Sequence, residues 1–215
     1  MRPWYAFNRF LLNIVTRSLF NVTAHNPENV PLEGGVLLLA NHQSNLDPTT
    51  IGMCLPREVD YLAKESLFKN PIAGKFLRSV NAYPVNIDNK GDIQAMKNMI
   101  KQLKDDRVVM IFPEGTRSFT GEMTTLKGGF DLIIRKSKVP IVPVIIHGTH
   151  QCLARKNGIQ PGKNIDIHYG KPLNYSDLSH LDRKGLVNHI QTILFDMHND
   201  ALKQLHQVPY PYHNK

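Results

Sequence analysis

Short apolar runs alternate with amphipathic segments along most of this chain, and this alternation restricts the folds that are open to it. Runs typical of buried strands lie at residues 37–40, 59–63, 80–86, 107–112, 139–146 and 165–169. Between them lie segments with helical spacing of apolar residues, of which the clearest runs from Asp92 to Lys104. The alternation predicts an α/β fold with a mostly parallel or mixed sheet that is flanked by helices.

The length and composition favour one domain with a substantial core. The chain has 215 residues, of which 41% are hydrophobic and 20% charged. We expect a first segment at residues 1–24 and a single domain at residues 25–210. The two cysteines, Cys54 and Cys152, stand in unrelated contexts. They indicate no disulfide framework and favour a reducing cytosolic setting.

The first 24 residues contain three arginines and no acidic residue. Trp4, Phe7 and Leu11 begin an apolar stripe at helical spacing, and Arg9 and Arg17 lie on another stripe. The pattern predicts a basic amphipathic helix that contacts a membrane interface. The alternative is a helix packed on the domain. Both interpretations hold if one face of the helix contacts the membrane and another packs on the domain. No apolar run reaches the roughly 18 residues of a spanning helix. We therefore expect a peripheral or monotopic protein at the cytoplasmic face of a membrane.

The net charge of +8 calls for an acidic partner. Nucleic acid, anionic lipid and phosphorylated substrates all satisfy that requirement. The chain carries no RNP-like aromatic segment, no zinc finger and no basic zipper. An anionic membrane surface is therefore expected as a partner, and nucleic acid is not.

A polar turn follows the strand at residues 37–40 and leads into a helix. Asp47-Pro48 is typical of a helix start, with the aspartate as N-cap and the proline in the first turn. On a continuous helix, His42 and Asp47 would lie roughly 140° apart, whereas a turn can bring them together. The carboxylate would then hold one ring nitrogen and leave the other as a base. The alternative is that Asp47 only caps the helix.

A second polar segment, Phe-Pro-Glu-Gly-Thr-Arg-Ser at residues 112–118, follows another strand. Together, the two segments resemble the motifs of glycerolipid acyltransferases of the lysophosphatidic acid acyltransferase type. That family carries NHxxxxD, then a Gly/Pro-Val-Arg segment, then FPEGTRS, then V-P-I-V-P-V, and the last motif occurs here at residues 139–144. The resemblance extends from about Gly34 to about Gly148, with the motifs in the same order.

The resemblance implies an enzyme, a 1-acylglycerol-3-phosphate O-acyltransferase. Such an enzyme moves an acyl chain from a thioester to the sn-2 hydroxyl of 1-acyl-sn-glycerol-3-phosphate and forms phosphatidic acid. By the same resemblance, His42 is the general base, Asp47 orients it, and no acyl-enzyme forms. Lys64 and Arg117 match the positions that bind the acceptor phosphate. The acyl donor is acyl-CoA or acyl-carrier protein, and we expect no further cofactor.

The remaining candidate residues surround Arg117. Gly115 permits a tight turn, and Thr116 completes the expected acceptor-binding loop. Glu114 would anchor this loop or contact a glycerol hydroxyl. Because sites in parallel sheets form beyond the carboxyl ends of the strands, residues that follow different strands can converge at one edge. We assign no metal ligand.

One position departs from the family pattern. The second family motif usually ends in Pro-Val-Asp/Asn-Arg, and here the arginine position holds Ile87. Either Lys64, Arg117 and a nearby cation such as Lys90 hold the phosphate, or the acceptor differs. In the second case, the acceptor would be another lysolipid or an alcohol in place of 1-acyl-sn-glycerol-3-phosphate.

Rival functions lack matching sequence features. A serine hydrolase would need a nucleophile elbow such as G-x-S-x-G, and the chain has none. His147, His150 and Cys152 do not have a standard zinc spacing, so core or surface histidines are the preferred interpretation. A non-catalytic lipid-binding protein is the main alternative to an enzyme, and the intact pair of His42 and Asp47 argues against it.

Overall fold

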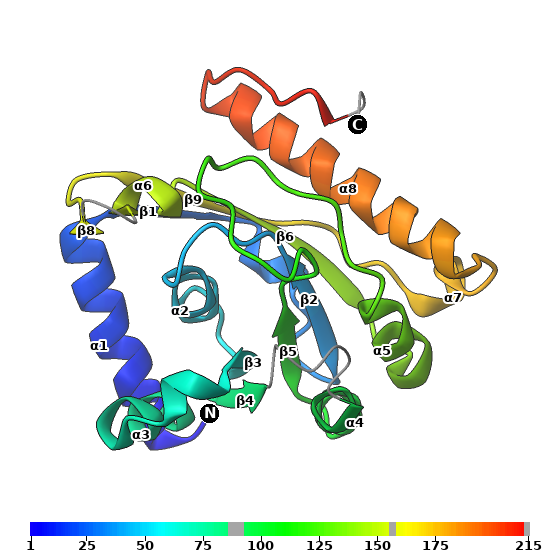
Figure 1. Ribbon diagram of the computed structural model, residues 1–215, viewed down its shortest axis with the longest axis horizontal. Helices are drawn as coiled ribbons and strands as arrows, with labels where there is room; N and C mark the ends of the chain where they lie inside the picture. Colours follow the sequence, from blue (N-terminus) through cyan, green and yellow to red (C-terminus); the bar gives the residue numbers. More distant parts are fainter. Residues whose placement is uncertain (86–92, 155–157, 213–215) are drawn as a thin grey trace.

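A seven-stranded mixed sheet with helices on both faces forms this protein, which confirms the predicted α/β class (Figure 1). The computed structural model describes residues 1–85, 93–154 and 158–212. The sheet strands are β1 (Asn21–His25), β2 (Val36–Ala40), β3 (Val59–Lys64), β4 (Ala82–Val85), β5 (Val108–Ile111), β6 (Ile141–His147) and β9 (Asn164–Tyr169). Two further short strands, β7 (Leu153–Ala154) and β8 (Gly158–Ile159), pair with each other.

Helices and 3-10 turns connect these strands. The α-helices are α1 (Pro3–Leu19), α2 (Asp47–Met53), α3 (Pro71–Ser79), α4 (Ile93–Lys104), α5 (Phe130–Ser137), α6 (Thr149–Cys152), α7 (Tyr175–Leu178) and α8 (Arg183–Gln204). The 3-10 turns are η1 (Pro27–Asn29) and η2 (Glu65–Phe68). The predicted cap Asp92 and the end of the predicted strand at residue 86 lie outside the described residues.

The strand order is β1-β9-β6-β2-β5-β3-β4. From β6 through β4 every pairing is parallel, whereas β9 runs antiparallel to β6 and carries β1 parallel to itself. The carboxyl ends of β2, β5 and β3 therefore lie side by side at one edge of the sheet.

The central strand β2 is buried on both faces, as its unbroken apolar run predicts. Because side chains alternate along a strand, Leu38 and Ala40 join the core cluster on one face, and Leu37 and Leu39 join the cluster on the other. Helices α1, α2 and α3 lie on the first side, and α4, α5 and α8 lie on the second (Figure 1). Truncating one of these leucines to alanine would cost about 2–5 kcal/mol of stability.

Helix α1 packs on the domain through a stripe of mixed polarity, which includes Leu12 and Leu19 as well as buried polar residues. Tyr5 is buried, and its hydroxyl accepts a hydrogen bond from the Val59 amide at 3.2 Å. Arg9 donates to the carbonyl of Leu55, and Arg17 donates to the carbonyl of Val22 at 3.0 Å. Arg9 and Arg17 thus donate to carbonyls of the domain, which supports the alternative of a helix packed on the domain.

The two prolines of residues 139–146 predict a strand that lies toward an edge or begins irregularly, and the first alternative is wrong because β6 lies between β9 and β2. The first proline, Pro140, precedes the strand. The second, Pro143, accepts a hydrogen bond from the Gly170 amide at 2.8 Å, just where the ladder with β9 ends. The amide hydrogen that proline lacks is therefore missing only from the end of the ladder.

From its sequence, the tail at residues 208–215 is expected to be loose, and this is wrong for Tyr210 and Tyr212, which anchor it to the domain. The ring of Tyr212 stacks on Phe195 of α8 with centroids 4.1 Å apart. Its hydroxyl accepts from the Met123 amide at 2.8 Å and lies 2.8 Å from Nδ1 of His198. The aromatic and polar contacts together bind this segment to the loop that precedes α5.

Candidate active site

The turn after β2 brings His42 and Asp47 into contact. The Nδ1 atom of His42 lies 2.8 Å from Oδ2 of Asp47. The same oxygen accepts from the backbone amides of Gln43 at 2.6 Å and Ser44 at 2.7 Å. The other oxygen accepts from the hydroxyl of Thr149 at 2.5 Å. Asp47 is fully buried, and its carboxylate is held by four donors in one orientation.

Asp47 does not cap α2 in the predicted way. The N-cap position is Leu46, and Asp47 occupies the first helical position before Pro48. The carboxylate bonds backward to the turn instead of forward to the helix amides. The side chain of Asp47 therefore stabilises the turn that carries His42 and contacts the imidazole directly.

The imidazole of His42 is fixed but still accessible. Its ring stacks on Phe112 with centroids 4.0 Å apart and an interplanar angle of 20°. The side chain keeps 18% of its surface exposed. Since Nδ1 is engaged by Asp47, Nε2 is the nitrogen that can take a proton from a substrate.

Glu114 joins the two motif segments. Its Oε1 accepts from the backbone amide of His42 at 2.9 Å, and its Oε2 accepts from the amide and hydroxyl of Thr124 at 2.7 and 3.0 Å. The amide of Ser118 donates back to the carbonyl of His42 at 2.7 Å. Burial raises the pKa of Glu114, and these hydrogen bonds oppose the shift. These contacts favour the role of loop anchor over that of a glycerol ligand.

Gly115 occupies the tight turn that the sequence predicts. Its φ is +67°, a left-handed conformation that glycine adopts without strain. A Cβ atom there would lie 2.8 Å from Nζ of Lys127, the end of a flexible side chain. The backbone conformation, more than the available space, therefore selects glycine.

Arg117 reaches the turn of the His42 motif. Its guanidinium carbon lies 5.6 Å from the ring centroid of Phe119. Together with Ser44, Asn45 and His150, it lines a cavity of about 390 Å³. A cation thus lines the same cavity as residues of the turn that carries the candidate base, and this cavity is large enough to admit part of a ligand.

The other predicted binding residues lie at the same edge of the sheet. Lys64 is exposed at the end of β3, which is the neighbour of β5. Gly115 and Thr116 are exposed in the loop after β5. Ile87, which departs from the second family motif, and Lys90, the nearby cation, lie outside the described residues.

Two contributors to the site went unpredicted. Thr149, just after β6, is fully buried against Asp47. Gln43 donates to the carbonyl of Gly121 at 3.0 Å, and its amide oxygen lies 3.1 Å from Nδ1 of His150. Both residues follow predicted strands, and that position is the signal which could have identified them.

The metal alternative that the sequence raised finds no support where the structure describes the chain. His147, His150 and Cys152 do not gather into a metal-ligating cluster there. Burial lowers the pKa of His147, whose Nδ1 lies 3.4 Å from Nε2 of the buried His198. His147 and His198 therefore belong to the packed layer between β6 and α8.

Comparison with known proteins identifies the family of this chain. A family model described as Acyltransferase matches residues 21–147. The 1-acyl-sn-glycerol-3-phosphate acyltransferase of Bacillus subtilis is 34% identical over 181 residues, covering 84% of this chain and 87% of that protein. The enzyme of the same name from Streptococcus pneumoniae is 30% identical over 217 residues, covering 98% and 78%.

A solved structure shares the fold. The 1-acyl-sn-glycerophosphate (LPA) acyltransferase PlsC from Thermotoga maritima aligns with a TM-score of 0.68 at 24% identity, over 90% of this chain and 81% of that one. The motifs, the matched family model and the relatives lead to one conclusion. This chain belongs to the acyltransferase family, as its resemblance to the lysophosphatidic acid acyltransferases implied.

Proposed function

We propose that this protein transfers an acyl chain from an acyl thioester to the sn-2 hydroxyl of 1-acyl-sn-glycerol-3-phosphate and so forms phosphatidic acid. The observation that carries the proposal is the contact of 2.8 Å between His42 and a fully buried Asp47. The names of the relatives from Bacillus subtilis and Streptococcus pneumoniae support the substrate and the product.

In the proposed reaction, Asp47 fixes the tautomer of His42 that has a hydrogen on Nδ1 and a lone pair on Nε2. Nε2 takes the hydroxyl proton while the acceptor oxygen attacks the thioester carbonyl. The carbon–sulfur bond then breaks, and the thiolate leaves and receives the proton from His42. The buried carboxylate stabilises the transient imidazolium charge. Acyl-CoA and acyl-carrier protein both fit this scheme as donors.

We further propose that Arg117 and Lys64 bind the acceptor phosphate. Arg117 lines the cavity beside the His42 turn, and its planar fork suits phosphate oxygens. Lys64 offers a point charge from the neighbouring strand end. The loop of Gly115 and Thr116 is exposed next to Arg117 and can approach the same group. Holding the phosphate places the free hydroxyl near the base.

Replacing Arg117 with alanine is expected to lower kcat/KM for 1-acylglycerol-3-phosphate about ten- to a hundredfold, because a charged hydrogen bond contributes about 1.5–3 kcal/mol. The KM for the acyl donor should change little. Turnover is measured by mass spectrometry with both donor types and a panel of lysolipid acceptors. Lys184→Ala removes an exposed cation from α8 and serves as the matched control.

The same assay tests the acceptor. Wild type should prefer 1-acylglycerol-3-phosphate to monoacylglycerol, which lacks the phosphate, and Arg117→Ala should narrow that preference. Equal use of both acceptors by wild type, or equal loss on both in the variant, would show that phosphate recognition is wrong. If wild type preferred a different lysolipid of the panel, the acyl transfer would be assigned to that lysolipid as the acceptor.

We propose that α1 holds the protein at the cytoplasmic face of an anionic membrane as a peripheral or monotopic enzyme. Large apolar side chains of this helix point into solvent, with Trp4 and Phe10 each 61% exposed and Phe7 50% exposed. The opposite stripe packs on the domain, so the apolar stripe is free to enter an interface. In the described part of the chain, no helix is long and apolar enough to cross a membrane.

Substituting Phe7, Phe10 and Leu11 together with glutamine should reduce sedimentation with anionic vesicles at least about tenfold, since each buried apolar side chain contributes about 1.5–3 kcal/mol. Deleting the whole helix would be a poorer test, because Tyr5 belongs to the core. Leu132→Gln on α5 is the control for an exposed apolar residue elsewhere. Unchanged vesicle binding would move the contact to α3, where Ile72 is 82% exposed.

A further inference from the structure

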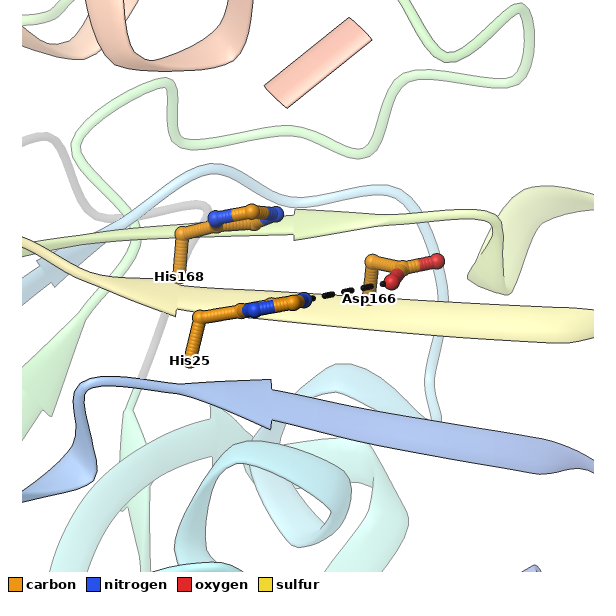
Figure 2. A group of neighbouring side chains, drawn as sticks. All are labelled: His25, Asp166 and His168. Carbon is orange, nitrogen blue, oxygen red and sulfur yellow. Dashed lines mark hydrogen bonds and ion pairs between the residues drawn. The ribbon is translucent and has the colours of Figure 1, made fainter. Parts of the chain in front are cut away.

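Three side chains that could bind a metal meet on one face of the β1–β9 pair. His25 pairs with His168 across the parallel ladder, and Asp166 lies two residues before His168. Because side chains alternate along strands, Asp166 and His168 share a face, and the register places His25 beside them. Figure 2 shows the three residues together. Strand β9 is separated from β2, which leads to His42, by β6.

The donor atoms of this His25/Asp166/His168 cluster are close enough to share one ion. The ligand atoms all lie within 4.8 Å of one another, and Nε2 of His25 is 3.4 Å from Oδ1 of Asp166. The two imidazole rings are stacked, with centroids 4.2 Å apart and planes inclined by 12°. Both rings extend toward the carboxylate (Figure 2).

His168 supplies an independent observation. Its Nε2 is buried and has no hydrogen-bond partner among the described residues. A buried polar atom without a partner is costly, so native proteins pair almost all of them.

We propose that His25, Asp166 and His168 bind a divalent first-row transition metal ion, of the class of zinc or cobalt, that links β1 to β9. Two imidazoles and one carboxylate suit these ions, whereas magnesium and calcium select oxygen ligands. The side chain of His25 is 38% exposed, so an ion can enter from solvent and keep water in its remaining positions. The bound ion would also engage the unpartnered nitrogen of His168.

The proposed ion would hold β1, the strand that directly follows α1, against β9. Helix α1 ends at Leu19, and β1 begins at Asn21 as the edge strand of the sheet. Two ligands come from β9 and one from β1, so the ion ties this edge strand to its neighbour. We expect metal to slow amide hydrogen exchange in β1 without taking part in acyl transfer.

Cobalt titration tests the proposal. The full-length protein, purified without a histidine tag and treated with EDTA, is titrated with Co²⁺ while its visible d–d absorption is recorded. Wild type should bind one equivalent and show the absorption of an ion with nitrogen ligands, and Zn²⁺ should displace it. His25→Gln and His168→Gln should each weaken binding at least about tenfold, in line with losses seen when metal sites are disturbed.

Two controls keep the result interpretable. His189→Gln changes an exposed histidine of α8 and should bind cobalt like wild type. Thermal unfolding in EDTA shows whether each variant is folded, and His25→Gln at the exposed edge is the variant expected to match wild type. Added Zn²⁺ should raise the melting temperature of wild type and His189→Gln but not of His25→Gln. Absence of stoichiometric cobalt binding, or equal affinity in His25→Gln and wild type, would overturn the proposal.

Discussion

Replacing His42 with alanine is expected to lower kcat by about a hundred- to ten-thousandfold, the range that a general base contributes. The reason is that Nε2 of His42 is the proposed acceptor of the hydroxyl proton, and alanine leaves no base in its place. The ring also stacks on Phe112, and 18% of the side chain is exposed. Because the imidazole is not deeply buried, its loss should leave the fold intact.

The measurement is kcat at saturating donor and acceptor, together with circular dichroism and thermal unfolding. His189→Ala, at an exposed position of α8, is the control for the loss of a histidine. Near-normal turnover in folded His42→Ala would remove this residue from the mechanism. A variant that loses both activity and its unfolding transition would instead be judged by His42→Gln, which keeps a side chain on Phe112 but supplies no base.

Replacing Asp47 with asparagine is expected to lower kcat by about a hundred- to several-thousandfold, because removing one charge of a buried pair costs about 3–5 kcal/mol. The amide oxygen can still accept from His42, Gln43 and Ser44, and the hydroxyl of Thr149 can turn to accept from the amide nitrogen. The turn should therefore persist, while the imidazolium loses its counter-charge.

Thr149→Val is the companion variant for Asp47. It leaves the carboxylate charged but removes the donor to one buried oxygen, which should cost about 1–3 kcal/mol of stability. Its kcat should fall less than that of Asp47→Asn, because the pairing with His42 remains. Comparing the free energy of unfolding with kcat in both variants separates support of the turn from support of the charge. If Asp47→Asn lost stability but kept its kcat, the carboxylate would serve the turn alone.

The predicted fold class rests on local patterns, and those patterns proved sufficient for most elements. The unbroken apolar run at residues 37–40 indicated a strand buried on both faces, and β2 is one. Asp182 begins α8 as an N-cap and accepts from the Gly185 amide at 2.7 Å. Such features act within one helical turn or one strand, so neighbouring residues are enough to reveal them.

The candidate site was partly visible for the same reason. His42 and Asp47 share one turn, and the residues from Glu114 to Arg117 share another, so their identities could be read from contiguous sequence. The sequence did not indicate that Glu114 bonds to the amide of His42 or that Thr149 bonds to Asp47. Those contacts join residues that only the parallel strands bring together.

What the sequence by itself determined is therefore the α/β class, the main strands and helices, and the two turns that carry the candidate site. The tertiary structure alone decided that β6 is central, that Arg9 of α1 faces the domain, and that Tyr212 is buried. It also assembled the His25/Asp166/His168 cluster from strands far apart in the chain. Strand order and helix orientation follow from which distant surfaces bury each other, and no local pattern of residues encodes that choice.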